Sequence, residues 1–307
     1  MLHPNRSNLH GHFSYELPPA LIIDSGETVR FKTLDAGWGI ARPAEPGFPT
    51  EVFTPKMDGK DNGHALIGPV EVKNAQPGMV LEIQINRIQP GTWGWNFAGG
   101  TKGGLNTRLN VSEGKRHHLL WDLDPDTMVG RNQDGHTVVL RPFMGVMGMP
   151  PNEPGIHPTG PPRICGGNLD CKELIAGTTL FLPIHVPGAL FSVGDGHAAQ
   201  GDGEVSAIAI ECPMELVDLT FYLRDDMRLA TPRAKTADAW ITLGLHEDLN
   251  EATALALEAM LDLMSDQFDM QRKEALALAS LGVEMRITQV VNGTRGVHAL
   301  LPHGAIR

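Results

Sequence analysis

The stretch VGDGHAAQGDGE, residues 193–204, separates two apolar segments that read as strands, residues 181–193 and 205–212. Its glycines permit positive φ angles and tight chain reversal, so we expect a structured loop there. The stretch also holds four ionisable side chains, which are Asp195, His197, Asp202 and Glu204. Carboxylates and an imidazole aimed into one space can bind a metal ion or act as acid and base. The simpler alternative is a turn whose carboxylates bond to nearby backbone amides.

A second glycine-framed loop lies upstream. Residues 166–170 read GGNLD and add Asn168 and Asp170 to the polar set. Together the two glycine-framed loops hold five acid or imidazole groups, which indicates a functional cluster.

Composition limits the kinds of partner. The chain has 307 residues, of which 41% are hydrophobic and 20% charged, and these proportions are typical of a globular protein. The formal net charge is −11 and no dense run of lysine and arginine occurs. Nucleic acid and anionic membrane need a basic surface, so we expect neither as a partner. Small neutral or cationic substrates remain open.

The cysteines and the N-terminal residues indicate in which cellular compartment the protein is expected. Cys165, Cys171 and Cys212 are odd in number and lack CxxC spacing, which does not indicate a disulfide framework. Residues 1–6 carry no basic-then-apolar leader, and no run approaches the ~18 apolar residues of a membrane span. We therefore expect a soluble cytoplasmic protein.

The periodicity of the chain is mainly that of strands. The 35 glycines and 23 prolines favour many short strands with shaped connections. Residues 81–86 alternate apolar and polar side chains most clearly, and alternation or short apolar runs also mark other segments. Those segments are 28–34, 119–123, 137–140, 214–222, 239–244 and 283–291. We expect residues 1–307 to form a single unit, or two intimately packed β-rich lobes.

Helical periodicity appears only near the C-terminus. Asn250 is the expected N-cap of a helix that runs to Phe268, with an apolar stripe along one face. Asp269 is the expected cap of a second helix over residues 270–281, and Gly282 stands where a glycine ends a helix. The predicted fold class is mainly β with this helical pair.

Several other features could contribute to a pocket. Residues 42–63 form a long connection rich in proline, glycine and charge, which predicts a lid or a binding loop. Trp38, Trp93 and Trp95 are candidates for a pocket wall. The His-x-His pair His10 and His12 has usable ligand spacing, although exposure to solvent is the expectation this close to the N-terminus.

No nucleotide or serine-hydrolase motif accompanies these features. The chain has no GxGxxG that opens a helix, no phosphate-binding P-loop and no GxSxG elbow. Its chemistry must therefore come from the acid, histidine and cysteine side chains.

The glycine-framed blocks resemble the signature blocks of the acetamidase/formamidase family. The blocks are residues 166–170, 188–192 and 194–204, with GPVEV at 68–72 and AQPG at 75–78. Asn74 and Met79 depart from the early signature at turn edges, which affects local shape rather than chemistry. The similarity runs from about residue 12 to the C-terminus.

The resemblance implies hydrolysis of a short aliphatic amide, formamide or acetamide, to ammonia and the carboxylic acid. It also implies a β-sandwich or jelly-roll-like fold with additional β structure, a homo-oligomer (dimer or higher) and a bound divalent metal. The matching residues, with His64 as a weaker match, are Asn168, Asp170, Asp195, His197, Gln200, Asp202 and Glu204.

From these residues we form a hypothesis for the mechanism. Asp170, Asp195 and His197 would bind the metal and leave one position free for water. Glu204 would act as general base and then protonate the leaving ammonia. Asn168 and Gln200 would be amide donors that orient the substrate or bind the oxyanion, and Asp202 belongs to the same catalytic set. Mixed oxygen and nitrogen ligands permit zinc, calcium or manganese.

Two alternatives stay open. Cys165 or Cys171 could be the nucleophile, with His197 as its base. The chain could instead be a non-enzymatic β-rich binding module in which a metal only braces a loop. A metal position that opens into a pocket would favour the hydrolase, whereas a closed oxygen cage would favour the binding module.

Overall fold

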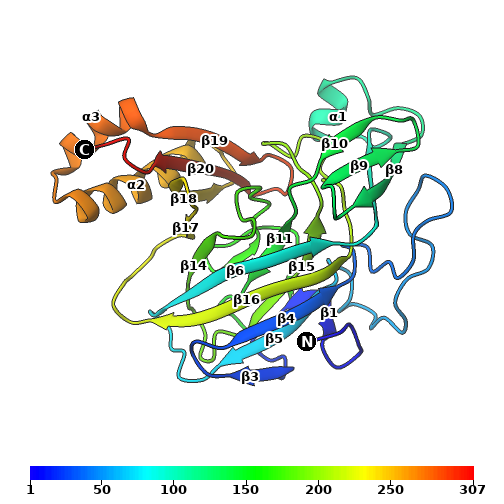
Figure 1. Cartoon of the computed structure of the whole chain (residues 1–307), viewed down its shortest axis with the longest axis horizontal. Coiled ribbons are helices and arrows are strands. Elements are labelled where there is room, and N and C mark those ends of the chain that lie inside the picture. The colour runs from blue at the N-terminus through cyan, green and yellow to red at the C-terminus, as the bar shows by residue number, and fades with distance from the viewer.

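The computed structural model describes residues 1–307 and shows a mainly β protein with three helices (Figure 1). The largest sheet has eight strands in the order β19-β20-β18-β17-β14-β6-β16-β4. All the strand pairs of this sheet are antiparallel. The strands are β4 (Thr28–Thr33), β6 (Val80–Pro90), β14 (Thr179–Pro183), β16 (Met214–Arg224), β17 (Arg233–Lys235), β18 (Ala239–His246), β19 (Glu284–Gln289) and β20 (Arg295–Pro302).

The second large sheet has six strands and carries most of the site described below. Its order is β1-β5-β15-β11-β13, with β3 paired in parallel to β5. The strands are β1 (Leu9–His10), β3 (Leu21–Ile23), β5 (Leu66–Val72), β11 (Phe143–Gly148), β13 (Gly166–Asn168) and β15 (Phe191–His197). Every residue of β11 and β15 is buried, so these two strands lie at the centre of the molecule.

The two large sheets share one hydrophobic core. A cluster of 43 buried residues takes side chains from β5 and β15 of one sheet and from β6 and β16 of the other. The rings of Phe191 on β15 and Phe221 on β16 meet edge to face, with centroids 5.1 Å apart. Leu81, Ile83 and Ile85 of β6 point into the core while Glu82 and Gln84 do not, which confirms the predicted amphipathic strand. The predicted β-dominated fold class is thus confirmed.

Smaller elements complete the β structure. A four-stranded sheet, β10-β9-β8-β7, lies to one side of the large sheets with the short helix α1 (Figure 1). A two-stranded ladder joins β2 and β12. These elements are β2 (His12–Phe13), β7 (Trp93–Ala98), α1 (Gly104–Arg108), β8 (His117–Asp124), β9 (Val129–Asn132), β10 (Thr137–Val139) and β12 (His157–Pro158).

The two longer helices cover one end of the eight-stranded sheet. Helix α2 (Leu249–Phe268) packs on β18 and β20, and α3 (Arg272–Gly282) follows it, so the C-terminal part forms a second apolar cluster (Figure 1). The predicted helical pair is therefore confirmed. None of the helices combines the length and the hydropathy of a membrane span.

The predicted helix caps were each wrong by a few positions. Asp248 caps α2, because its carboxylate accepts from the backbone amides of Asn250 and Glu251. Asp269 is the left-handed C-cap of α2 rather than the N-cap of α3, which is Gln271. Gly282 is the last residue of α3. An aspartate between two helices can end the first or begin the second, and its backbone conformation decides which it does.

Candidate active site

A cavity of about 660 Å³ opens beside β15, between the sheets and the connection that precedes β5. It is lined by acidic, imidazole, amide and tryptophan side chains from segments far apart in the sequence. The side chains that the argument below uses are His12, Trp38, Lys56, Lys60, His64, Trp95, Asn168, Asp195, His197, Glu204, Glu211 and Asn292.

Strand β15 supplies Asp195 and His197. Successive side chains of a strand alternate between its faces, so these two point the same way. The prediction of a loop from residue 193 onward was wrong here, because β15 continues to His197 and pairs with β11. The predicted strand over 205–212 was also wrong, since these residues link β15 to β16 through a turn at 205–206 and form only isolated β-bridges at Glu211. Glycine at 194 and 196 serves close strand packing rather than a turn: an added Cβ at Gly196 would lie 2.7 Å from the backbone of Cys212.

Gly145 on β11 provides the space in which the acidic side chains meet. A Cβ atom at this position would lie 2.5 Å from Oδ2 of Asp195 and 2.9 Å from Oδ1 of Asp170. It would also lie 2.8 Å from Cε1 of His197. Glycine is therefore required here for the three side chains to converge.

Asp170 enters the same space from the segment after β13. Asp170 is 1% exposed, and its Oδ1 has no hydrogen-bond partner. One of its carboxylate oxygens lies within 4.8 Å of a carboxylate oxygen of Asp195 and of a ring nitrogen of His197. The structure thus brings together the three residues predicted as metal ligands.

Two glutamates of the β15–β16 connection complete the cluster. His197 Nε2 lies 3.3 Å from Oε1 of Glu211 and 3.4 Å from Oδ2 of Asp195. Glu204 and Glu211 form with His197 a second set of ligand atoms within 4.8 Å. Sequence reasoning missed Glu211. The available signal was a single acid inside the otherwise apolar run 205–212.

Three of these acids sit on strained backbone. Asp170, Asp195 and Glu204 have φ values of 48°, 59° and 45°. Residues other than glycine rarely adopt this left-handed region, and each such residue costs on the order of 1–3 kcal/mol. Strain retained at three acids of one cluster indicates selection for function rather than for stability.

Gln200 fixes the orientation of His197. Its Nε2 donates to the backbone oxygen of Asp170 at 2.8 Å, so its Oε1 faces Nδ1 of His197 at 2.9 Å. A carbonyl oxygen can only accept, and Nδ1 therefore carries the proton. Nε2 is therefore the nitrogen that faces the carboxylates, and once it loses its proton its lone pair can bind a metal, as in a metal-ligating histidine. Gln200 does not line the cavity, so it positions His197 and does not contact substrate.

The charges of the cluster are unbalanced. Burial raises the pKa of Glu204 to about 7 and that of Glu211 to about 8, and it holds the pKa of Asp170 well above its usual range. Burial also disfavours charge on His197, but the carboxylates of Glu211 and Asp195 raise its pKa well above the usual value. No lysine or arginine forms an ion pair with any of the four carboxylates.

The cluster fits a divalent cation. Buried oxygens without a hydrogen-bond partner are costly, and Asp170, Glu204 and Glu211 each have one. Asp170, Asp195 and His197 form one set of ligand atoms and His197, Glu204 and Glu211 form another, and both sets are rich in the oxygen donors that suit such an ion. Several of these groups line the cavity, so a cation held by them would face the cavity and would not lie in a closed cage.

Asn168 lines the cavity, and the atom free to bind a ligand is its side-chain oxygen rather than the predicted nitrogen donor. Its Nδ2 donates to the backbone oxygen of Gly160 at 3.0 Å. Its Oδ1 is buried and has no partner. Asn168 can therefore accept a hydrogen bond from a bound molecule, whereas the sequence hypothesis gave it a donor role.

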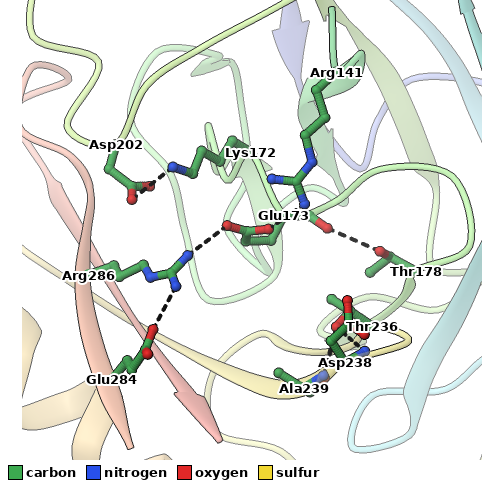
Figure 2. A network of polar contacts seen from close by, with 10 residues as sticks. All are labelled: Arg141, Lys172, Glu173, Thr178, Asp202, Thr236, Asp238, Ala239, Glu284 and Arg286. Atoms are coloured by element: carbon green, nitrogen blue, oxygen red, sulfur yellow. Dashed lines mark hydrogen bonds and ion pairs between the residues drawn. The ribbon is translucent and has the colours of Figure 1, made fainter. Parts of the chain in front are cut away.

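Asp202 lies outside the cavity, although it stands two residues before Glu204. Its side chain is partly exposed and pairs with Lys172 at 2.9 Å. Figure 2 shows this pair beside a second network, in which Arg286 and Arg141 contact Glu173 at 3.2 Å and 2.8 Å. Asp202 thus belongs to a surface ion-pair network, and we leave it out of the catalytic set.

The His-x-His pair near the N-terminus is buried, which corrects the expectation of exposure. His10 and His12 are each 3% exposed. His12 lines the cavity and contacts the backbone oxygen of Lys60 at 2.8 Å. His64 also lines it, with Nδ1 2.8 Å from the hydroxyl of Thr159.

The cavity wall includes part of the connection predicted as a binding loop. Lys56 and Lys60 come from it. Trp38 and Trp95 line the cavity as predicted, whereas Trp93 does not.

The cysteines do not reach this site. Cys165, Cys171 and Cys212 are buried and none lines the cavity. Burial raises the pKa of Cys165 to about 11 and that of Cys171 to about 12, so both thiols are protonated at neutral pH. Thiolate is the reactive form of cysteine, and the arrangement gives a cysteine nucleophile no support.

Comparison with known proteins agrees with this site and fold. The sequence model of the acetamidase/formamidase family matches residues 2–156 and 154–236. A Schizosaccharomyces pombe protein named as a formamidase is 29% identical over 251 residues, which cover 65% of this chain and 60% of that protein. The acetamidase of Mycolicibacterium smegmatis is 27% identical over 204 residues, which cover 47% of this chain and 49% of that protein. The chain thus spans about half to three-fifths of the length of these curated relatives.

A solved structure extends the likeness to nearly the whole chain. The crystal structure of an acetamidase from Bacillus halodurans superposes with a TM-score of 0.85 at 27% sequence identity. The superposition covers 98% of this chain and 97% of that one.

Proposed function

We propose, from the premise that this chain belongs to the acetamidase/formamidase family, that it hydrolyses a short aliphatic amide to ammonia and a carboxylic acid. The observation that carries the proposal is the acidic cluster at the cavity. Asp195, His197, Glu204 and Glu211 all line one cavity, and oxygens of two of them have no partner.

The proposed cation site consists of Asp170, Asp195, His197 and Glu211. A divalent cation bound there supplies positive charge that polarises a carbonyl group and acidifies water. Gln200 keeps Nδ1 of His197 protonated, and Asn292 donates to Oδ2 of Asp170 at 2.6 Å. Both contacts orient ligand side chains before any substrate binds.

Glu204 is the proposed general base. It reaches the cavity with a buried Oε2 that no donor occupies. A carboxylate in this position can take a proton from the attacking water and return it to the leaving nitrogen. The amide C–N bond then breaks, a C–O bond forms, and ammonia and the acid are released.

Asn168 is proposed to hold the amide group. Its free Oδ1 can accept one N–H of a primary amide, while the contact of its Nδ2 with Gly160 fixes the side chain. This role distinguishes a primary amide from the carboxylate product, which offers no donor at that position.

The test is ammonia release from formamide, acetamide and propionamide before and after chelation, with metal content measured on the same sample. Release that is lost on chelation and restored by one of zinc, calcium or manganese supports the metal-assisted hydrolase. A tightly held metal without release from any amide contradicts it, and favours the binding module with a structural metal.

We further propose that the chain acts as a homo-oligomer in the cytoplasm. The support for self-association is the free edge of β19 in the eight-stranded sheet, where exposed Met285 and Ile287 lie. Sedimentation of the purified chain tests it.

A further inference from the structure

The cavity is much larger than formamide or acetamide requires. Its volume of about 660 Å³ lies within the range of pockets that bury drug-sized ligands, roughly 300–1,000 Å³. A molecule as small as acetamide would fill only the part next to the acidic cluster, and the rest of the cavity would hold water.

Part of the cavity wall is apolar. The indole N–H of Trp38 donates to the backbone oxygen of Gly63 at 2.9 Å, and that of Trp95 donates to Asp35 at 2.7 Å. Both indole N–H groups are thus already bonded, and Trp38 and Trp95 are only 1% and 4% exposed, so they add little ring surface to the cavity. Ile156 and Ile208 line it as well. Such a wall favours an apolar acyl group longer than acetyl.

The connection before β5 adds positive charge to this wall. The ammonium group of Lys56 lies 4.6 Å from the ring centroid of Trp38, and neither Lys56 nor Lys60 forms an ion pair. The nearby carboxylate of Asp61 is already paired with Arg6 at 2.7 Å. Two unpaired lysines on one cavity wall stand out in a chain of net charge −11.

The lining of the cavity therefore carries groups of both charges. Carboxylates gather next to Asp195, and two ammonium groups line the wall that the connection forms. A substrate that matches both regions has an uncharged amide at one end and an anionic group at the other.

We propose that the preferred substrate is a primary amide whose acyl group is an apolar chain ending in a carboxylate. This inference rests on the amidase activity proposed above. Lys56 would contact the terminal carboxylate, and Ile156 and Ile208 would contact the chain. Water adds to the amide carbonyl, the C–N bond breaks, and the products are ammonia and a dicarboxylate.

The test compares three amides: acetamide, hexanamide and the monoamide of adipic acid. Hexanamide and the monoamide have the same number of carbons. Hexanamide ends in a methyl group, whereas the monoamide ends in a carboxylate. We expect kcat/KM for hexanamide to exceed that for acetamide at least about tenfold, because added methylenes bury apolar surface. We expect the monoamide to exceed hexanamide by about 5- to 10-fold through the ammonium contact.

Charge variants identify the residue responsible. Lys56→Gln should reduce the monoamide-to-hexanamide ratio of kcat/KM to about one, and Lys56→Arg should restore most of it. Lys102→Gln, at a lysine whose side chain is 82% exposed, is the matched control and should keep the wild-type ratio. Circular dichroism and the Tm of each variant show that it folds.

The outcomes separate this inference from the proposed function. Acetamide turnover with no preference for the longer amides overturns the inference alone, as does a ratio that Lys56→Gln leaves unchanged. No release of ammonia from any of the three amides overturns the proposed function and the inference with it.

Discussion

The side-chain amide of Asn292 donates a 2.6 Å hydrogen bond to Oδ2 of Asp170, across 122 residues of sequence. Asn292 lies in the loop between β19 and β20, which Gln289 holds in shape. The buried Gln289 accepts from the backbone amides of Val291 and Asn292 at 2.9 Å and 3.2 Å, and donates to Thr294 at 2.6 Å. The C-terminal hairpin thereby becomes part of the site.

Asn292→Ala should weaken metal binding. The change removes the donor that orients Asp170. Loss of such a contact lowers metal affinity or activity by roughly 10- to 100-fold. Chelator competition measures the affinity. Asn106→Ala, at a half-buried asparagine of α1 that does not line the cavity, is the control and should bind metal normally. Unchanged metal affinity in Asn292→Ala would show that the contact serves the hairpin alone.

Glu204→Gln should stop turnover and leave the metal bound. The amide cannot take a proton from water, so kcat should fall at least about 100-fold. Ammonia release and metal content are measured on the same preparation. Glu211→Gln is the contrasting variant, in which the metal content should fall because a proposed ligand is lost. Normal turnover in Glu204→Gln would remove that residue from the mechanism.

Gly145→Ala should disrupt the cluster itself. The new methyl group would overlap the carboxylate of Asp195, so the side chains must separate, and overpacking of this kind costs roughly 1–3 kcal/mol. Metal content, ammonia release and the urea concentration at the midpoint of unfolding should all decrease. Gly201→Ala is the control, since a Cβ there meets nothing within 4 Å. Equal metal content in both variants would contradict the prediction.

His10 should make stability depend on acidity. Burial lowers its pKa to about 4, while Nδ1 donates to the backbone oxygen of His12 at 2.7 Å. In the unfolded chain a histidine has a pKa near 6.5. Between these values the unfolded state binds the extra proton, so stability present above about pH 6.5 is lost as pH falls towards 4. The loss is on the order of 3 kcal/mol.

Urea unfolding of the metal-free protein near pH 7 and near pH 4 measures this loss. His10→Gln should flatten the dependence by about that amount, although Asp61, Arg6 and His12 act on the same group. His303→Gln, at an exposed histidine, should keep the wild-type dependence. An equal pH dependence in the two variants would exclude His10 as its source.

Much of the fold follows from local pattern. The alternation over residues 81–86 reports a strand with one face in the core, and β6 has that face buried. The apolar stripe near the C-terminus became α2, with Leu261 and Met264 buried. The pattern wrongly predicted a strand at residues 205–212, because an apolar run can also form an irregular connection between two strands.

The site was only partly predictable for a different reason. The glycine-framed blocks identified Asp170, Asp195 and His197, which the fold does bring together. Glu211, Asn292 and Gly145 join them through contacts that depend on strand order and loop shape. No local pattern reports these.

The sequence by itself determined that the chain is mainly β, where its two longer helices lie, and which blocks carry the acidic chemistry. Strand and helix periodicity are properties of neighbouring residues, so they can be read without the fold. Only the tertiary structure decided that Glu204 points into the cavity while Asp202 pairs with Lys172 on the surface. That choice depends on the left-handed backbone of Glu204 and on which strands lie beside β15, and both are set by packing over the whole chain.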